Sequence, residues 1–324
     1  MTIYICETLY HVMIASLLAK SNQSIILCTS HEKKNMANFY GLDTGKIPNI
    51  YYFFRFRSSL LENVGIEIIR DRYFLRHLQK QHGFKDFDLV NFAWSINSID
   101  RSSAYYYKKA KSVVFYEEGA NGAIGIPQSK MKLLIKKFFG IPVDFYDDLK
   151  LKSVFVQNPN FYDNRFMLKL QSFSLMDVYE KSEQKKNIVE LFLSDEKVKA
   201  LKSVGEKTIV FTQPLSEDGF ITENEKIDIY RKLCRELARR DVFLKLHPRD
   251  TSDYTSCKAI LIKGSFPSEL LTILGMEFYM AIGICTSAVN NIDAKYRINL
   301  NNNFLRDKKF DISMLTEILE REGI

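Results

Sequence analysis

The chain has 324 residues, of which 46% are hydrophobic and 26% charged, and it contains only 14 Gly and 7 Pro. This composition excludes an intrinsically disordered chain and a fibrous one, and the length predicts about two domains. The formal net charge is +7, and the basic excess lies in the first part of the chain, since residues 1–180 hold 23 basic and 17 acidic side chains.

The first half alternates apolar runs, which predict strands, with stretches of helical periodicity. Residues 3–6 form the first run, and Thr8 is placed to cap a helix that continues to Leu18. The further strands predicted in this half are 24–28, 87–92, 112–116 and 154–156. Strands that alternate with amphipathic helices predict β/α units around a parallel sheet.

The same pattern restarts after a charged stretch of helical period, residues 180–207, which is typical of a linker. The strands predicted here are 208–211, 242–246, 259–262 and 280–284, and the helices are 223–240, 267–275 and 312–322. We therefore predict two α/β domains, 1–180 and 181–324. Ligands bind beyond the carboxyl ends of the strands in such sheets, so the residues after each strand are the first candidates for a site.

Five cysteines lie far apart and include no Cys-x-x-Cys pair, which argues against a disulfide framework and against a zinc site. The first basic residue is Lys20, and Glu7 and His11 interrupt the first apolar segment, so it does not resemble a signal peptide. No run approaches the ~20 apolar residues of a membrane-spanning helix. We therefore expect a soluble protein of the cytoplasm.

The strand 112–116 is followed by Glu117, Glu118 and Gly119. Two adjacent carboxylates raise the pKa of one of them, which suits a catalytic base. A solvated turn, in which Gly119 supplies a positive φ, is the structural alternative.

Polar groups also follow two strands of the second half. Glu217, Asp218 and Gly219 come shortly after 208–211, and they suit either a second acidic site or an ordinary turn. His247 follows 242–246 and is either a solvated loop residue or, beside basic neighbours, a cationic imidazole that binds a phosphate and donates a proton to it as it leaves.

Two further groups suit a nucleotide. Glu269 opens a predicted helix, where it either complements the helix dipole or accepts hydrogen bonds from ribose hydroxyls. Thr286, Ser287 and Ala288 follow the strand 280–284 and either cap a helix or direct hydroxyls and amides at an anion.

Taken in order, these motifs resemble those of the bacterial sialyltransferases. The matching stretches are Glu-Glu-Gly at 117–119, Thr-Gln-Pro-Leu-Ser-Glu-Asp at 212–218, Lys-Leu-His-Pro-Arg at 245–249, Phe-Pro-Ser-Glu at 266–269 and Thr-Ser-Ala at 286–288. The Thr-Gln-Pro stretch and the opening residues 5–8 are most similar to glycosyltransferase family 52, which includes lipooligosaccharide and capsular sialyltransferases. The resemblance runs from residue 3 to about 290.

The resemblance implies a GT-B fold, in which two Rossmann-like domains face each other across a central cleft. It implies an N-terminal acceptor domain, a C-terminal donor domain, and inverting, metal-independent transfer from CMP-sialic acid to a sugar hydroxyl such as a terminal galactose. Asp218 matches the general base, His247 the general acid, Glu269 the ribose ligand, and Thr286 with Ser287 the phosphate segment. In related families the base lies in the acidic-acidic-Gly motif, which would make it Glu118, and Glu217 beside Asp218 is a further alternative. The family 52 pattern favours Asp218.

The remaining expectations complete this assignment. The further donor-binding residues are Lys245, Pro248, Arg249 and Ala288. The further substrate-binding residues are Thr8, Glu117, Gly119, Gln213 and Pro214. We expect no cofactor and no metal. Some relatives form homodimers, so the resemblance also allows a homodimer.

Residues 101–140 hold eight basic side chains, and the segment 130–139 is both basic and amphipathic. It is either a surface helix with a solvated lysine face or a site of peripheral contact with an anionic membrane. No nucleic-acid recognition motif accompanies the charge. Two other functions stay open: transfer of another sugar, Kdo or glycerol phosphate from a nucleotide donor, and ligand binding without catalysis.

Overall fold

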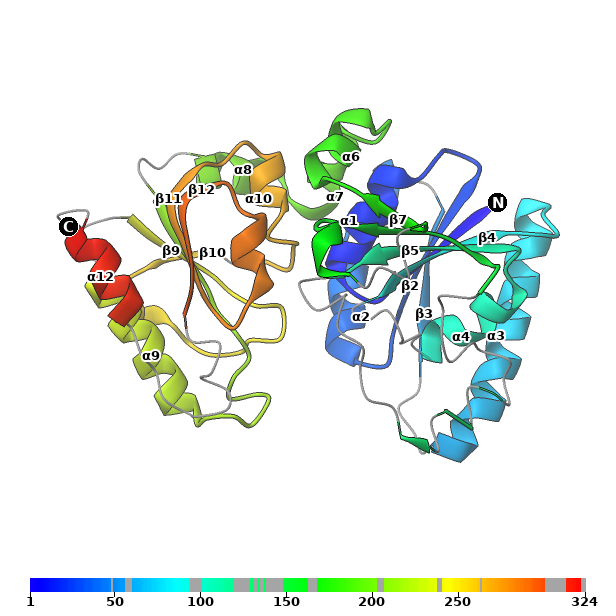
Figure 1. The fold of residues 1–324 in the computed structure, drawn as a ribbon, viewed down its shortest axis with the longest axis horizontal. Helices are drawn as coiled ribbons and strands as arrows, with labels where there is room; N and C mark the ends of the chain where they lie inside the picture. Colours follow the sequence, from blue (N-terminus) through cyan, green and yellow to red (C-terminus); the bar gives the residue numbers. More distant parts are fainter. Residues whose placement is uncertain are drawn as a thin grey trace. The chain divides into compact units, whose positions relative to one another are not determined.

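The computed structural model describes residues 1–47, 49–55, 60–93, 101–118, 129–130, 133–134, 137, 148–162, 168–202, 207–237, 241–262, 264–300 and 313–321. The chain divides into two compact units, Met1–Leu191 and Phe192–Ile324. Each unit is an α/β structure around its own sheet (Figure 1). The boundary expected from the sequence, residue 180, falls within helix α6 (Leu175–Lys181).

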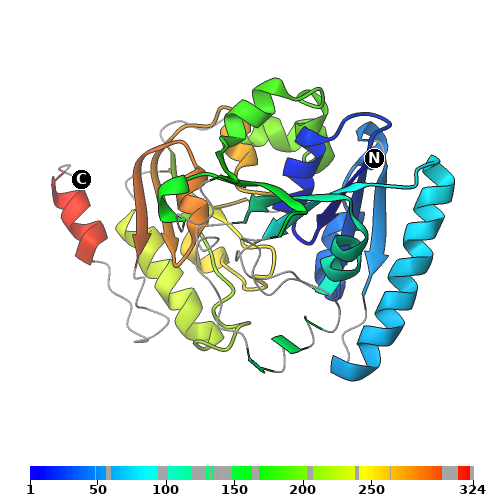
Figure 2. The ribbon, with the colours of Figure 1, turned by 45° about the vertical axis from the view of Figure 1, so that its right-hand side comes forward.

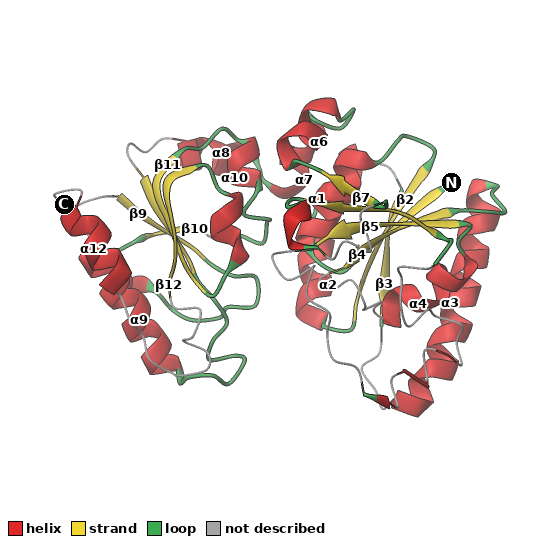
Figure 3. Ribbon diagram, viewed as in Figure 1, coloured by secondary structure: helices red, strands yellow, loops and turns green. Residues whose placement is uncertain are grey.

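Unit 1 contains a seven-stranded parallel sheet in the order β3-β2-β1-β4-β5-β6-β7 (Figure 3). Its strands are β1 (Thr2–Cys6), β2 (Ser24–Ser30), β3 (Ile50–Phe54), β4 (Asp88–Ala93), β5 (Ser112–Glu117), β6 (Leu151–Val156) and β7 (Leu170–Ser172). Its helices are α1 (Leu9–Leu18), α2 (Lys33–Tyr40), α3 (Leu60–His82), α4 (Arg101–Lys109), α6 and α7 (Asn187–Phe192), with 3-10 turns η1 (Thr44–Lys46) and η2 (Pro159–Phe161). The strand order reverses between β1 and β4, so the carboxyl ends of these strands form the switch point where such sheets bind ligands.

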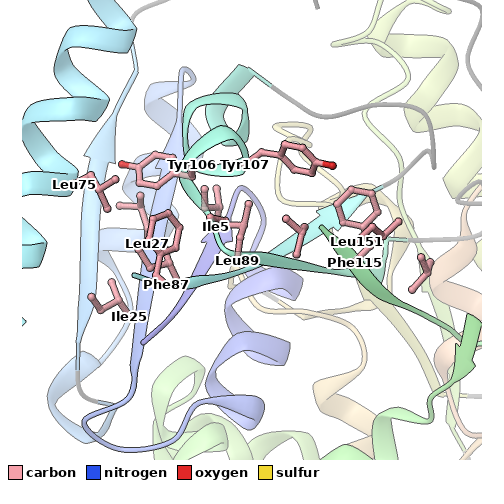
Figure 4. Packing of buried hydrophobic residues seen from close by; sticks show 14 of the residues in the cluster. Ile5, Ile25, Leu27, Leu75, Phe87, Leu89, Tyr106, Tyr107, Phe115 and Leu151 are labelled. Atoms are coloured by element: carbon pink, nitrogen blue, oxygen red, sulfur yellow. The ribbon is translucent and has the colours of Figure 1, made fainter. Parts of the chain in front are cut away.

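The core of unit 1 follows from the period of two along each strand. Ile5 of β1 and Leu27 of β2 are fully buried on one face of the sheet, because alternate residues of neighbouring strands point to the same side. Tyr106 and Tyr107 of α4 and Leu75 of α3 pack on that face (Figure 4). The long α3 runs beside the strands of this unit (Figure 2). Each such buried side chain contributes ~1.5–3 kcal/mol, so this layer holds the carboxyl edge of the sheet in place.

Unit 2 contains a five-stranded parallel sheet in the order β10-β9-β8-β11-β12. Its strands are β8 (Lys207–Phe211), β9 (Asp241–Lys245), β10 (Ile260–Ile262), β11 (Phe278–Ile284) and β12 (Ala294–Leu300). Its helices are α8 (Asp195–Lys202), α9 (Glu223–Glu236), α10 (Leu270–Ile273) and α12 (Ser313–Arg321), with 3-10 turns η4 (Thr255–Cys257) and η5 (Ser287–Asn291). The switch point here lies between β8 and β11.

Helix α9 covers the sheet of unit 2 and begins with a capping box. The Thr222 hydroxyl accepts from the Glu225 amide at 3.3 Å, and the Glu225 carboxylate accepts from the Thr222 amide at 2.7 Å. Tyr230 and Leu233 on the inner face of the helix are fully buried in the core of this unit. The helix therefore has a defined start directly beyond the loop that follows β8.

The predicted α/β class with parallel sheets is confirmed. Three strands were not predicted from the sequence: β3, β7 and β12. All three are edge strands and are only partly buried. Polar residues interrupt the apolar run in β7 and β12, whereas β3 is the continuous run Ile-Tyr-Tyr-Phe-Phe, so the sequence does carry the strand pattern there. The predicted linker 180–207 contains α7 and α8.

Candidate active site

The carboxyl edge of the unit 2 sheet brings the loops after β8 and β9 into contact through Thr212. The Thr212 amide donates to the Lys245 carbonyl at 3.1 Å, and its hydroxyl accepts from the His247 amide at 2.9 Å. Thr212 is almost fully buried. It is a positioning residue, which the sequence placed in the Thr-Gln-Pro stretch without giving it a role of its own.

His247 lies half-buried just beyond β9, with its ring orientation set by its own turn. Its Nδ1 accepts a hydrogen bond from the Arg249 amide at 3.1 Å, so the neutral ring carries its proton on Nε2. Burial and, next, the Arg249 charge lower the pKa of His247 to about 4, although Asp250 opposes the shift. At neutral pH the imidazole is therefore uncharged, in contrast to the cationic ring expected from the sequence, and offers an N–H donor.

Arg249 holds Asp218 in a bidentate ion pair. Its Nη1 and Nη2 donate to the two carboxylate oxygens at 2.6 and 3.0 Å, and the side chains are 41% and 30% exposed. Both partners are thus reachable from solvent, and a bound phosphate would compete with Asp218 for the guanidinium. Gly219, with φ of 75°, completes the turn that carries Asp218 in a conformation that disfavours a side chain.

Glu217 is turned the other way, into a charge network under the loop 247–251. One of its oxygens accepts from Lys226 Nζ at 2.6 Å, and the other accepts from the Thr251 amide and hydroxyl at 2.7 and 3.0 Å. Burial favours a higher pKa of Glu217, but these hydrogen bonds outweigh it and lower the pKa to about 2. Glu217 is therefore a weak proton acceptor, and its hydrogen bonds hold the loop 247–251 in place.

Lys226 is the centre of this network and its side chain is fully buried. Besides Glu217, its ammonium contacts Asp250 at 3.1 Å. Asp250 in turn accepts from the Tyr254 hydroxyl at 2.8 Å, and its amide donates to the His247 carbonyl at 2.9 Å. The network ties the His-Pro-Arg turn to helix α9.

Lys245 occupies the end of β9 but is buried, with 4% of its surface exposed. Its ammonium donates to the carbonyls of Leu246 and Gly264, both at 3.3 Å, and lies 4.1 Å above the ring of Phe266. Burial outweighs the attraction of Glu269 and lowers the pKa of Lys245 to about 8. The Lys245 ammonium, which the sequence predicted to bind a phosphate, therefore contacts the loop after β10 instead.

Glu269 links the start of α10 to the turn η5. Its two oxygens accept from Asn291 Nδ2 at 2.9 Å and from the Ser268 hydroxyl at 3.1 Å. The side chain is buried and does not cap α10, although it directly precedes that helix. The carboxylate therefore has a fixed position near the segment after β11.

Thr286 begins the segment after β11 and caps η5, with its hydroxyl accepting from the Ala288 amide at 3.3 Å. Asn299 of β12 bonds both the amide and the carbonyl of Thr286. A Cβ on Gly283 would lie 2.2 Å from Thr286 Cγ2 and 2.7 Å from Val289 Cγ2, so only glycine lets this segment fold back over β11.

Gln213, Pro214 and Pro248 shape the loops that carry Asp218 and His247. The Gln213 amide donates to the Tyr230 hydroxyl at 2.8 Å, and the Pro214 carbonyl accepts from the Asp218 amide at 2.9 Å. Pro248 lies half-buried in the turn between His247 and Arg249.

In unit 1 the two adjacent glutamates have different environments. Glu117 is buried, accepts from the Gln157 amide at 2.7 Å, and bonds the Tyr162 hydroxyl. Burial raises the pKa of Glu117, whereas the adjacency of the two acids had pointed to the neighbouring carboxylate as the cause. Glu118 lies 3.0 Å from His11. Thr8 caps α1, as predicted, by accepting from the His11 amide at 3.3 Å.

Some predicted residues lie outside the described part of the chain. They are Gly119, the side chain of Ser287 and most of the basic segment 130–139. Of the basic residues between 101 and 140, those that are described and exposed are Lys108, Lys109, Lys111, Lys130 and Lys137.

Two further features concern metals and membranes. Within the described ranges, no group of three or more His, Cys, Asp and Glu side chains is arranged to hold a metal ion. None of the described helices combines the length and apolar character needed to cross a membrane.

Residues 177–300 match the family model of glycosyltransferase family 52. The matched stretch covers most of unit 2 and includes Asp218, His247, Glu269 and Thr286. An uncharacterized protein of Haemophilus influenzae is 29% identical over 155 residues, or 47% of this chain. The match spans 50% of that relative's length.

Two solved structures are similar over most of the chain. The UDP-GlcNAc 2-epimerase of Methanocaldococcus jannaschii, in complex with UDP-GlcNAc and UDP, has a TM-score of 0.49 and 14% identity, covering 92% of this chain and 90% of that one. The UDP-N-acetylglucosamine 2-epimerase of Rickettsia bellii has a TM-score of 0.48 and 12% identity, covering 90% and 77%. At these identities the likenesses identify no shared substrate.

Proposed function

We propose that this protein is an inverting, metal-independent sialyltransferase, which moves sialic acid from CMP-sialic acid to a sugar hydroxyl of a bacterial surface glycan. The observation that carries the proposal is the His247–Arg249 turn at the carboxyl end of β9, within the stretch that matches family 52. This turn offers an imidazole N–H and an exposed guanidinium at one edge, which is the chemistry that a leaving phosphate needs.

The phosphate of the donor would change the state of both residues. A phosphate beside His247 favours the imidazolium and so opposes the burial that keeps the ring neutral in the free protein. Arg249 would bind the same phosphate with its planar fork and release Asp218. As the bond from the anomeric carbon to the phosphate oxygen breaks, the imidazolium gives its proton to the departing CMP.

The acceptor hydroxyl attacks the opposite face of the same carbon and loses its proton to a carboxylate. Asp218 and Glu118 are the two candidates for this base. Asp218 has both oxygens occupied by Arg249 in the free protein, whereas Glu118 belongs to the unit to which we assign the acceptor. Glu269 would bind the ribose, and the amides and hydroxyl of the segment that begins at Thr286 would bind the phosphate.

A panel of donors tests this proposal. Purified protein is incubated with CMP-sialic acid, CDP-glycerol or a UDP-sugar and a galactoside acceptor, each with and without EDTA. We expect transfer from CMP-sialic acid alone, with an unchanged rate in EDTA, and loss of the product when either Asp218 or Glu118 is replaced by Ala. Turnover of a UDP-sugar in its place would overturn the donor assignment, and the less impaired of the two Ala variants would identify the residue that is not the base.

The surroundings of the enzyme are part of the proposal. We propose a cytoplasmic protein that meets its acceptor at the inner membrane face, with the exposed Lys108, Lys109 and Lys111 facing anionic headgroups. The acceptor would be a capsular or lipooligosaccharide glycan, and the protein would act alone or as a homodimer. Sedimentation with anionic and with neutral vesicles tests the membrane contact.

A further inference from the structure

His11 lies at the switch point of the unit 1 sheet, in the first turn of α1 after β1. Only 2% of its surface is exposed, and its ring stacks on Phe92 of β4 with the centroids 4.4 Å apart and the planes at 9°. The Glu7 amide donates to its Nδ1 at 3.1 Å. The stack and this hydrogen bond fix both the plane of the ring and its rotation within that plane.

The second ring nitrogen faces the acidic motif. Because Nδ1 accepts a hydrogen bond, the neutral ring carries its proton on Nε2, which lies 3.0 Å from the Glu118 carboxylate. This Nε2 is buried and has no aligned hydrogen-bond partner among the described residues. A buried N–H without a partner is costly, so the Glu118 carboxylate is the group that can satisfy it with a small rotation.

Glu118 can also be reached from outside. Its side chain is 29% exposed, while the neighbouring Glu117 is buried and bonded to Gln157. Of the two adjacent carboxylates, only Glu118 therefore combines access with a fixed partner. The pair Glu118 and His11 resembles the base and orienting group of other acid–base sites, in which the inner member sets the position of the outer one.

We infer that His11 is a positioning residue that holds the Glu118 carboxylate in place to receive the proton of the acceptor hydroxyl. This inference rests on the proposed function, since it names the base of that reaction and a residue that acts through it. The hydroxyl proton goes to Glu118, the hydroxyl oxygen bonds the anomeric carbon, and the nucleotide phosphate leaves with the electron pair. His11 takes no proton from the hydroxyl and acts only through its hydrogen bond to Glu118.

Two conservative variants separate the two sides of the ring. In His11→Gln the amide nitrogen reaches the position of Nε2 and still donates to Glu118. In His11→Asn the amide oxygen takes the position of Nδ1 and accepts from Glu7, but nothing reaches Glu118. The two variants therefore differ mainly in whether Glu118 keeps its donor.

The readout is kcat, KM and kcat/KM for the acceptor, at saturating CMP-sialic acid. We expect His11→Asn to lose on the order of 100-fold, as for a misplaced catalytic group, and His11→Gln to stay within roughly tenfold of the wild type. The loss in His11→Asn should fall mainly on kcat, because a misplaced base slows the chemical step more than it weakens acceptor binding. Equal losses in both variants, or no loss in either, would overturn the inference.

Two measurements keep this test independent of folding and of the proposed function. If the wild type does not consume CMP-sialic acid, the proposed function has failed; if it does and His11→Asn behaves as the wild type, only the inference has failed. The second measurement is the ¹⁵N signal of the His11 imidazole in the wild type and in Glu118→Gln. We expect the Nε2–H tautomer in the wild type and a shifted Nε2 signal in the variant, and an unchanged signal would contradict the contact.

Discussion

At the scale of single residues, His247 shows how local surroundings decide a protonation state. The turn that carries it uses the Arg249 amide to orient the ring, while burial and the guanidinium keep the imidazole neutral. The free protein therefore holds this imidazole uncharged, and under the proposed function the phosphate of the donor would favour its protonation.

Replacing His247 by Ala should lower the rate of transfer by about 10²–10⁴-fold, the usual contribution of a general acid. Binding of CMP should weaken much less, because Arg249 and the segment at Thr286 are unchanged. Single-turnover kinetics and calorimetric titration with CMP measure the two effects separately. A variant that turns over as fast as the wild type would remove His247 from the mechanism.

The same residue should make the fold sensitive to acid. Its pKa is lowered from 6.5 to about 4, so the native state binds fewer protons than the unfolded state between these values. The stabilisation is complete above pH 6.5 and is lost as pH falls toward 4, by up to about 3 kcal/mol. Urea unfolding at pH 7 and pH 5 should show a larger loss in the wild type than in His247→Asn. Equal losses would contradict the lowered pKa.

At the scale of elements, α9 supports the site through a residue that does not reach it. Lys226 comes from the buried face of α9 and meets Glu217 and Asp250, which flank the loops after β8 and β9. A buried cation between carboxylates leaves those carboxylates unpaired when it is removed, which is costly.

We expect Lys226→Met to destabilise the protein by about 3–5 kcal/mol. Lys232→Met, on the exposed side of the same helix, is the control and should stay within about 0.5 kcal/mol of the wild type. The free energy of unfolding in urea measures both. If the two variants unfold alike, the network does not stabilise the loop in the way that its geometry indicates.

At the scale of the whole molecule, each unit has its own sheet, core and switch point. The proposed donor residues belong to unit 2 and the His11–Glu118 pair to unit 1. Under the proposed function, unit 2 binds the donor and unit 1 binds the acceptor.

Hydrogen exchange with and without CMP tests that assignment. We expect slower exchange of the amides in 212–219, 247–251 and 286–288, because a bound nucleotide restrains the loops at the carboxyl edge. The segment 33–47 of unit 1 serves as the reference and should not change. Protection confined to unit 1 would contradict the assignment of the donor to unit 2.

The sequence by itself determined the α/β class, the central strands and the places where polar groups follow them, because buried parallel strands are continuous apolar runs. It did not reveal the edge strands β7 and β12, whose polar residues interrupt that pattern, whereas the edge strand β3 does carry an apolar run. Only the tertiary structure decided what each candidate side chain contacts. Glu217 and Glu118 both read as acids beside a turn, yet one is bound by a buried lysine and the other lies against a buried histidine. Those partners come from helices α9 and α1, and contacts between elements distant in the chain have no local sequence pattern.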